Sequence, residues 1–276
     1  TTKTTITFPF DYPDLTFDES NGNRTPIHIA LVDMTRKNML AYPVEEMNSI
    51  NGIWNDGQLT LYKGFLGNYL PSATYNYRAG IPLTQTQAFD GRHENPNYFY
   101  KTGTYDGYDV NGNLLQYHKE NDQNVSYIWG YNGIYPIAKA VNAQLGEFAY
   151  SSFEDNALIN GGGCYGAEWS CGYGVIHSDD AHTGNRSLEN QGSTIRSVKI
   201  FPAGIYKISL WAKNKAGYSG GAITGIPGEP MWPGDTVWKY NERIFTLFSA
   251  QSIVLSTTDN ILIDDICLYP VNTQMT

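Results

Sequence analysis

Short runs of alternating apolar and polar residues occur throughout the chain, with turn residues between them. Residues 205–213 alternate between two sets of positions. One set is apolar and contains Tyr206, Ile208, Leu210 and Ala212; the other is mostly polar and contains Lys207, Ser209, Trp211 and Lys213. Successive side chains of a β-strand point to opposite faces of its sheet. We therefore expect a half-buried strand here, with Trp211 on the solvent-facing side.

The first half of the chain has the pattern of a β-meander. Strand-length segments separated by Asn-Gly, Asp-Gly or other glycine-containing turns cover residues 44–54, 57–66, 73–80 and 97–109. Only residues 27–40 show helical periodicity, which predicts one short helix. Residues 108–143 continue the strand pattern through Asn111-Gly112 and Asn132-Gly133, so we expect consecutive hairpins there.

The second half contains longer and more hydrophobic strand-like segments. They cover residues 147–154, 194–201, 204–213, 237–249, 251–257 and 260–270. Six such strands with turns between them and no helical stretch predict an antiparallel β-sandwich. A short polar segment around residues 143–147 separates the two patterns, so we expect domains at residues 1–143 and 144–276 of an all-β protein.

Composition narrows the class of protein. The 276 residues are 14% aromatic and only 16% charged, which is typical of an extracellular all-β protein. A formal net charge of -9 without a cluster of Lys and Arg argues against nucleic-acid binding. The sequence contains no run of eighteen apolar residues, so no transmembrane helix is predicted. The sequence starts at Thr1 without Met, which fits a mature or excised segment.

The three cysteines predict at most one disulfide. Cys164 and Cys171 flank a glycine-rich loop in which a local bridge forms easily, although two free thiols remain the alternative. A zinc site is disfavoured because one Cys pair leaves the tetrahedron incomplete, even with His177 and His182 nearby. Cys267 lies in an apolar strand and is expected to be buried.

No catalytic group is predicted. Ser219 lies in a G-x-S-x-G pattern, but no histidine follows it and no helix pattern begins there, so chance in a glycine-rich loop explains the match. The acidic pairs Glu45/Glu46, Asp179/Asp180 and Asp264/Asp265 are sequence neighbours, which point to opposite faces of a strand. None of them is a ready-made acid and base for glycoside hydrolysis, although pairs distant in sequence stay open.

The first half resembles bacterial YD-repeat, or Rhs-type, secreted and surface proteins. The residues that carry this resemblance are FPFDY at 8–12, VDMTRKNMLAYPVEE at 32–46 and the segment 108–143. It implies a chain of β-hairpin repeats, usually noncatalytic, that forms part of a larger secreted or cell-surface protein of bacteria.

The second half resembles carbohydrate-binding modules with a galactose-binding-like jelly-roll fold. The resemblance rests on SFE at 152–154, DDAHTGNRSL at 179–188, YKISLWAK at 206–213 and IDDICLYP at 263–270, although the long insertion before Trp238 departs from it. Such modules often hold one structural calcium ion. Carried onto this chain, the resemblance nominates Glu154, the backbone near Asn185, and Asp264 as ligands, since calcium prefers carboxylate and carbonyl oxygens.

Two noncatalytic functions follow. One is a structural or adhesive fragment of a YD-repeat protein with glycan binding by the C-terminal domain. The other is a dedicated carbohydrate-binding module accessory to a glycoside-active enzyme. An exposed aromatic ring can contact the C–H face of a sugar while polar neighbours bind its hydroxyls, so Trp211, Trp232 and Trp238 are the glycan-binding candidates; structural packing of Trp238 is the competing interpretation.

Overall fold

The computed structural model describes residues 2–12, 25–77, 89, 98–155, 157–159, 163–165, 168–172, 174–177, 180–258 and 260–276. The chain forms two compact units, Thr1–Asp122 and Gln123–Thr276. The predicted domain boundary at residue 143 lies within the second unit and stays a prediction.

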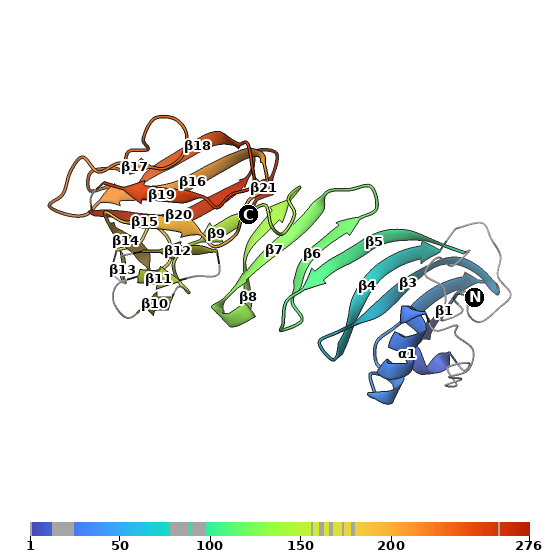
Figure 1. The fold of residues 1–276 in the computed structure, drawn as a ribbon. Coiled ribbons are helices and arrows are strands. Elements are labelled where there is room, and N and C mark those ends of the chain that lie inside the picture. The colour runs from blue at the N-terminus through green and yellow to red at the C-terminus, as the bar shows by residue number, and fades with distance from the viewer. Residues whose placement is uncertain are drawn as a thin grey trace. The chain divides into compact units, whose positions relative to one another are not determined.

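The first unit is an antiparallel meander with one α-helix among its described residues. Its strands follow one another in chain order, as the blue-to-green series in Figure 1 shows, and each pairs with the next. The elements are β1 (Thr2–Thr7), a 3-10 turn (Pro9–Asp11), α1 (Pro26–Arg36), β2 (Glu45–Ile50), β3 (Ile53–Phe65), β4 (Asn68–Tyr77), β5 (Phe99–Tyr108) and β6 (Leu114–Lys119). Within the described residues, the predicted meander and the short helix are confirmed.

Helix α1 covers one face of this sheet. Thr25 caps its N-terminus by accepting a hydrogen bond from the His28 N–H, and Pro26 occupies the first helical position, where its missing N–H costs nothing. The helix buries its apolar side against alternate residues of β2 to β5, and the shared core contains Ile27, Ala30, Leu31, Met34, Met47, Leu59, Leu61, Tyr75 and Phe99. The opposite face of the sheet keeps the polar residues of the same alternation.

The second unit contains a β-sandwich. One sheet has the strand order β10-β11-β12-β15-β19-β17, and the other has the order β13-β14-β20-β16-β18 with β9 paired to β20. Their bounds are β9 (Ala149–Ser151), β10 (Ala157–Ile159), β11 (Gly163–Tyr165), β12 (Trp169–Cys171), β13 (Gly174–His177), β14 (Ser187–Gln191), β15 (Thr194–Ser197), β16 (Gly204–Asn214), β17 (Ile223–Thr224), β18 (Lys239–Leu247), β19 (Val254–Thr257) and β20 (Asn260–Pro270). Each pair of adjacent strands described in the two sheets is antiparallel.

One apolar core joins the two sheets. Trp169, Ile195 and Leu255 from the first sheet and Leu188, Ile208, Leu210 and Phe245 from the second are all buried in it. The predicted all-β class and antiparallel sandwich are therefore confirmed. We refer to the second sheet as the β16 sheet, because its outer face, away from this core, carries the candidate site.

Three further strands of the second unit pair with one another. They are β7 (Asn124–Gly130), β8 (Tyr135–Val141) and β21 (Gln274–Met275), with β8 in the centre, and a 3-10 turn (Tyr131–Gly133) joins β7 to β8. Together with β6, these strands confirm the predicted hairpin pattern of residues 108–143. Asn132-Gly133 forms part of a 3-10 turn with positive φ at Tyr131 and Asn132, instead of a two-residue turn.

Candidate aromatic binding site

The alternation of β16 puts Trp211 on the outer face of the β16 sheet. Tyr206, Ile208, Leu210 and Ala212 are buried in the core, whereas Lys207, Trp211 and Lys213 are half-buried on the other face. Ser209 shares that face but is covered. Tyr240 of β18 lies directly opposite Trp211 in the register, and the two ring centroids are 5.5 Å apart. Tyr240 is 45% exposed, so the outer face presents an aromatic surface to solvent.

A loop from a distant part of the chain completes this surface. The His182 imidazole stacks on the Trp211 indole at a centroid distance of 3.8 Å and an interplanar angle of 13°. Trp238 meets His182 edge-on at 6.1 Å. The ammonium of Lys213 lies 5.1 Å from the centroid of the Trp238 ring, within the range of a cation–π interaction. We call His182, Trp211, Lys213, Trp238 and Tyr240 the Trp211 cluster.

A β-bulge in β20 places the carboxylate that holds His182. The pairing of β16 with β20 shifts between Ser209 and Trp211, and Asp265 adopts a positive φ of 49° at this point. The Asp265 carboxylate lies 2.8 Å from Nδ1 of His182 and accepts hydrogen bonds from the hydroxyls of Thr183 and Tyr150, at 2.7 and 3.1 Å. Without the extra residue, Asp265 would continue the core-facing series of Ile261 and Ile263.

Two carboxylates hold the backbone of the His182 loop. Oδ2 of Asp264 accepts from the backbone N–H groups of His182 and Thr183, at 2.8 and 3.1 Å. Oε1 of Glu154 accepts from the N–H groups of Asn185 and Arg186, both at 2.7 Å. Charge-assisted hydrogen bonds of this kind are about twice as strong as neutral ones. The loop that carries His182 is thus fixed at both ends.

The loop requires a glycine at position 184. The φ of Gly184 is +64°, and a Cβ atom at this position would lie 2.4 Å from Oε1 of Glu154. A side chain would therefore be strained by the backbone conformation and would displace the carboxylate that accepts from the next two residues.

Asp264 is fully buried, and this changes its acidity. Burial, together with the nearby carboxylate of Asp265, raises the pKa of Asp264 to about 7, although hydrogen bonds from the backbone of His182, Thr183 and Asp265 act in the opposite direction. The proton affinity of this group is therefore set mainly by loss of contact with water.

The calcium prediction concerns the same residues. Glu154 and Asp264 supply oxygens suited to a hard cation, but in this structure those oxygens accept backbone N–H groups, and the guanidinium of Arg186 donates to the Glu154 carbonyl at 2.8 Å. Among the described residues no group of three or more His, Cys, Asp or Glu side chains is placed to hold a metal. The residues fit calcium only in part, and the calcium site stays a prediction.

The remaining predicted site residues lie outside the Trp211 cluster. Trp232 is 51% exposed and makes no described ring contact with the cluster. Residue 164 pairs with residue 171 in the register of β11 and β12, and Cys171 is disulfide-bonded. The side chain of Cys164 lies outside the described part of the structure, so its pairing stays a prediction. Cys267 is a free, buried thiol, as expected.

Three of the residues considered for catalysis, Ser219, Glu45 and Glu46, are not members of the Trp211 cluster. Ser219 lies exposed in the loop between β16 and β17, and no helix follows it among the described residues. Glu45 is buried, and its carboxylate accepts from the Tyr12 hydroxyl at 3.5 Å, whereas Glu46 is exposed on the other face, as the alternation predicts. Asp179 lies outside the described residues.

Sequence patterns identified Trp211 and Trp238 but missed His182, Lys213 and Tyr240 as members of the site. Tyr240 alternates with the core residues of β18, so its outward orientation could have been read from the sequence. The position of His182 depends on the bulge and on two carboxylates distant in sequence, for which no local signal exists.

Comparisons with known proteins yield distant structural similarities. No protein-family model matches the sequence, and no curated protein matches it. The xylan-binding family 22 carbohydrate-binding module CBM22-1 of a Paenibacillus barcinonensis protein is 14% identical, with a TM-score of 0.33 over 46% of this chain and 96% of that chain. A family 6 module of a laminarinase from Zobellia galactanivorans is 16% identical, with a TM-score of 0.27 over 36% and 92%.

A C-terminal family 22 module from Clostridium thermocellum is 15% identical, with a TM-score of 0.29 over 46% of this chain and 94% of that chain. The YD-repeat resemblance of the first half stays a prediction. Among the described residues, no helix is both long enough and apolar enough to cross a membrane.

Proposed function

We propose that this chain is a noncatalytic carbohydrate-binding protein whose second unit binds a neutral glycan at the Trp211 cluster. The observation that carries the proposal is the outward-facing arrangement of Trp211, Trp238 and Tyr240 among charged and hydroxyl groups. A sugar has apolar C–H faces and a rim of hydroxyls, so a surface that combines aromatic rings with hydrogen-bonding groups matches both parts.

His182 changes which aromatic surface a sugar would meet. Because its imidazole covers one face of the Trp211 indole, the ligand would contact the remaining surface of Trp211 together with Tyr240 and Trp238. The stack fixes the orientation of the Trp211 ring before binding, which reduces the entropy lost when a ligand binds.

Paired charges around the cluster favour a neutral ligand. Lys213 lies 2.6 Å from Asp180, and Lys207 lies 3.0 Å from Glu242, which also accepts from the Tyr240 hydroxyl. These two lysines thus each have a carboxylate beside them, so the surface offers donors and acceptors while much of its positive charge is balanced, which favours a neutral sugar over an ionic one.

The wider role that we propose is that of a secreted or cell-surface module accessory to a glycoside-active enzyme. A structural or adhesive part of a larger surface protein is the second candidate. It is supported by β1, which within the described first unit pairs only with β2 and leaves an edge at which another chain can add.

The proposal is tested by titrating wild-type protein and the Trp211→Ala and Tyr240→Ala variants with neutral oligosaccharides that a glycan array identifies. We expect wild type to bind, and each variant to lose at least about tenfold in affinity, equivalent to about 1.4 kcal/mol. Isothermal titration calorimetry measures the affinity, and the thermal unfolding midpoint verifies that each variant is folded.

Phe248→Ala is the matched control, because it removes another aromatic side chain of the second unit that is 92% exposed and outside the cluster. This variant should bind like wild type. Absence of wild-type binding to any glycan on the array, or equal affinities for Trp211→Ala and wild type, would reject the proposed site and leave the structural candidate.

A further inference from the structure

The polar face of the first unit contains a row of aligned side chains. Glu46 of β2 pairs with Gln58 of β3, Gln58 pairs with Asn76 of β4, and Asn76 pairs with Tyr100 of β5. Directly paired residues in neighbouring strands place their side chains on the same face of a sheet. The register therefore produces a line of carboxylate, amide, amide and phenol groups across four strands, which we call the Gln58 row.

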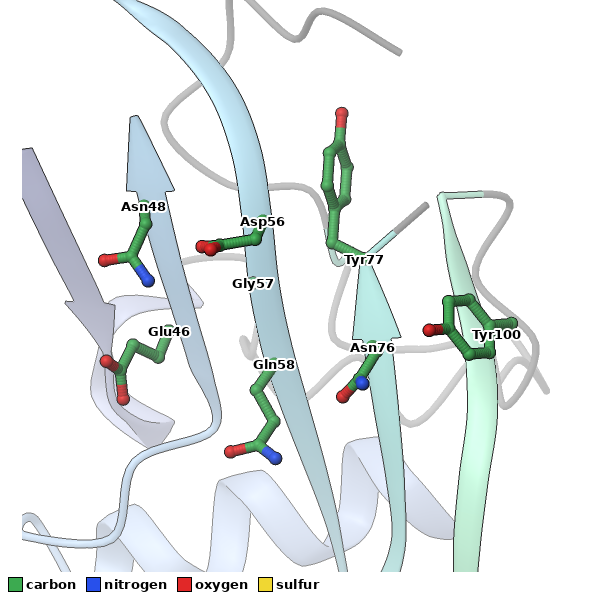
Figure 2. A pocket seen from close by; sticks show the side chains of 8 residues that line it. All are labelled: Glu46, Asn48, Asp56, Gly57, Gln58, Asn76, Tyr77 and Tyr100. Atoms are coloured by element: carbon green, nitrogen blue, oxygen red, sulfur yellow. The ribbon is translucent and has the colours of Figure 1, made fainter. Parts of the chain in front are cut away.

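Two hollows in the sheet surface follow this row. The first has a volume of about 350 Å³, and Figure 2 shows the residues that line it on four neighbouring strands, among them Glu46, Gln58, Asn76 and Tyr100. The second has a volume of about 370 Å³ and extends the lining to Tyr117 and other residues of β5 and β6. Both hollows are lined by Gln58 and Asn76, so they adjoin each other, and we call the two together the groove.

A glycine leaves the floor of the groove open. Gly103 lies within β5, opposite Thr74 of β4 and Lys119 of β6. A Cβ atom at this position would lie 3.2 Å from the Thr74 hydroxyl, so any larger residue would crowd the floor. Glycine inside a strand weakens the strand and often marks a place where a ligand approaches the backbone closely.

The chemistry of the lining selects the ligand. The groove is lined mainly by amides, hydroxyls and tyrosine rings, and Tyr105 and Tyr117 pair across β5 and β6 with ring centroids 6.3 Å apart. The lining carries two carboxylates, Glu46 and Asp56, against one ammonium group, that of Lys119, so its charge is negative on balance and disfavours a polyanion such as a nucleic acid or an acidic polysaccharide. The scarcity of aliphatic side chains disfavours an apolar peptide or lipid.

We infer that this groove binds an extended, neutral oligosaccharide across the strands of the first unit. From β2 to β6 it crosses four strand spacings, which is roughly 19 Å at the usual separation of neighbouring strands. Several linked sugar rings fit this length. Amides contribute paired donors and acceptors to sugar hydroxyls, and Tyr100 and Tyr117 offer ring surface to the sugar C–H groups. This site is independent of the Trp211 cluster.

The experiment uses the full chain carrying Trp211→Ala, so that the cluster in the second unit is impaired. Cello-, xylo- and mannohexaose are titrated into this protein, with calorimetry as the readout. We expect at least one hexasaccharide to bind with a stoichiometry of one. Introducing Gln58→Ala and Asn76→Ala together into the Trp211→Ala protein should weaken that binding at least tenfold. Introducing Tyr100→Ala alone into the same protein, at a side chain that is 47% exposed, should weaken it as well.

Asn55→Ala in the same background is the matched control, because Asn55 is an exposed amide on β3 that does not line the groove. It should bind like the Trp211→Ala protein. Failure of the Trp211→Ala protein to bind all three hexasaccharides, or equal affinities with and without the Gln58 and Asn76 substitutions, would overturn the inference. So would binding of an extended peptide but of no hexasaccharide. Wild-type binding that is lost with Trp211→Ala alone would still support the Trp211 cluster.

Discussion

The sequence predicted that the carboxylates of Asp264 and Glu154 act together, but it did not predict which groups they contact. The resemblance nominated both as oxygen donors brought together from distant segments, and the structure does bring their carboxylates to the same loop. There they accept backbone N–H groups of residues 182–186. A carboxylate can bind either a cation or a backbone N–H group, so the sequence alone does not distinguish a calcium ligand from a hydrogen-bond acceptor at these positions.

The raised pKa of Asp264 predicts a pH dependence of stability. Its pKa is about 7 in the folded protein and near the ordinary value of 3.8 in the unfolded chain, so between these pH values the folded state holds a proton that the unfolded state has lost. Stability should therefore fall as pH rises from about 4 to about 7, by at most about 4 kcal/mol from this group, and change little from it above that range.

Thermal unfolding midpoints of wild type and Asp264→Asn between pH 4.5 and 8 measure this effect. The variant should lose most of the decline that wild type shows as pH rises. Asp235→Asn, at an exposed carboxylate, is the control and should follow wild type. The same slope in Asp264→Asn and wild type would contradict the assignment to Asp264.

Elements whose pattern is local were predicted well. Strands β2 to β5, β9, β15, β16 and β18 to β20 arise from alternation and turn residues close together in the chain, and α1 arises from apolar residues on one helical side. Strands β10 to β14 and β17 were not among the predicted segments. The connection at Asn132-Gly133 was less predictable. Its dipeptide is typical of a two-residue hairpin turn, but Tyr131 also adopts a positive φ and the three residues form a 3-10 turn.

The loop at residues 182–186 provides a prediction about glycine. Gly184→Ala should destabilise the protein by roughly 1–2 kcal/mol from backbone strain alone, and by more because its Cβ would lie 2.4 Å from Glu154. The displaced loop should also withdraw His182 from Trp211. The ring protons of His182, shifted upfield in the NMR spectrum by the stacked indole, should return toward ordinary values.

Gly192→Ala separates strain from crowding. Gly192 has a φ of +70° but open space around the position of a Cβ atom. Its substitution should cost stability by strain alone and leave the His182 resonances unchanged. An unchanged His182 spectrum in Gly184→Ala would show that the carboxylate of Glu154 moves without disturbing the stack.

The described residues form three separate apolar cores: one under α1 in the first unit, one between the two sheets of the sandwich, and a small one around Ile128, Ala140 and Phe148 in the second unit. Each core draws its residues from elements of the same unit. This division assigns the two candidate glycan surfaces, the Gln58 row and the Trp211 cluster, to different cores, so a substitution in one core should leave the other surface intact.

Leu210→Ala tests this separation. Leu210 is fully buried between the sheets, directly behind the outer face that carries Trp211, so its truncation should cost about 2–5 kcal/mol of stability in the second unit. Hydrogen exchange followed by mass spectrometry should show faster exchange in β16, β18 and β20 and unchanged exchange in β3 and β4. Equal acceleration in both units would indicate that they unfold together.

The alternation of apolar and polar residues in the sequence was sufficient to predict the all-β class, the sandwich strands β9, β15, β16 and β18 to β20, and the outward orientation of Trp211. The reason is that the direction of a strand side chain depends on a period of two residues. The partners of that side chain depend on contacts between distant segments. His182 reaches Trp211 through a bulge at Asp265, more than eighty residues away, and the Gln58 row requires the register of four strands. A one-residue change in any of those pairings would move the side chains to the opposite face, and tertiary packing selects the register.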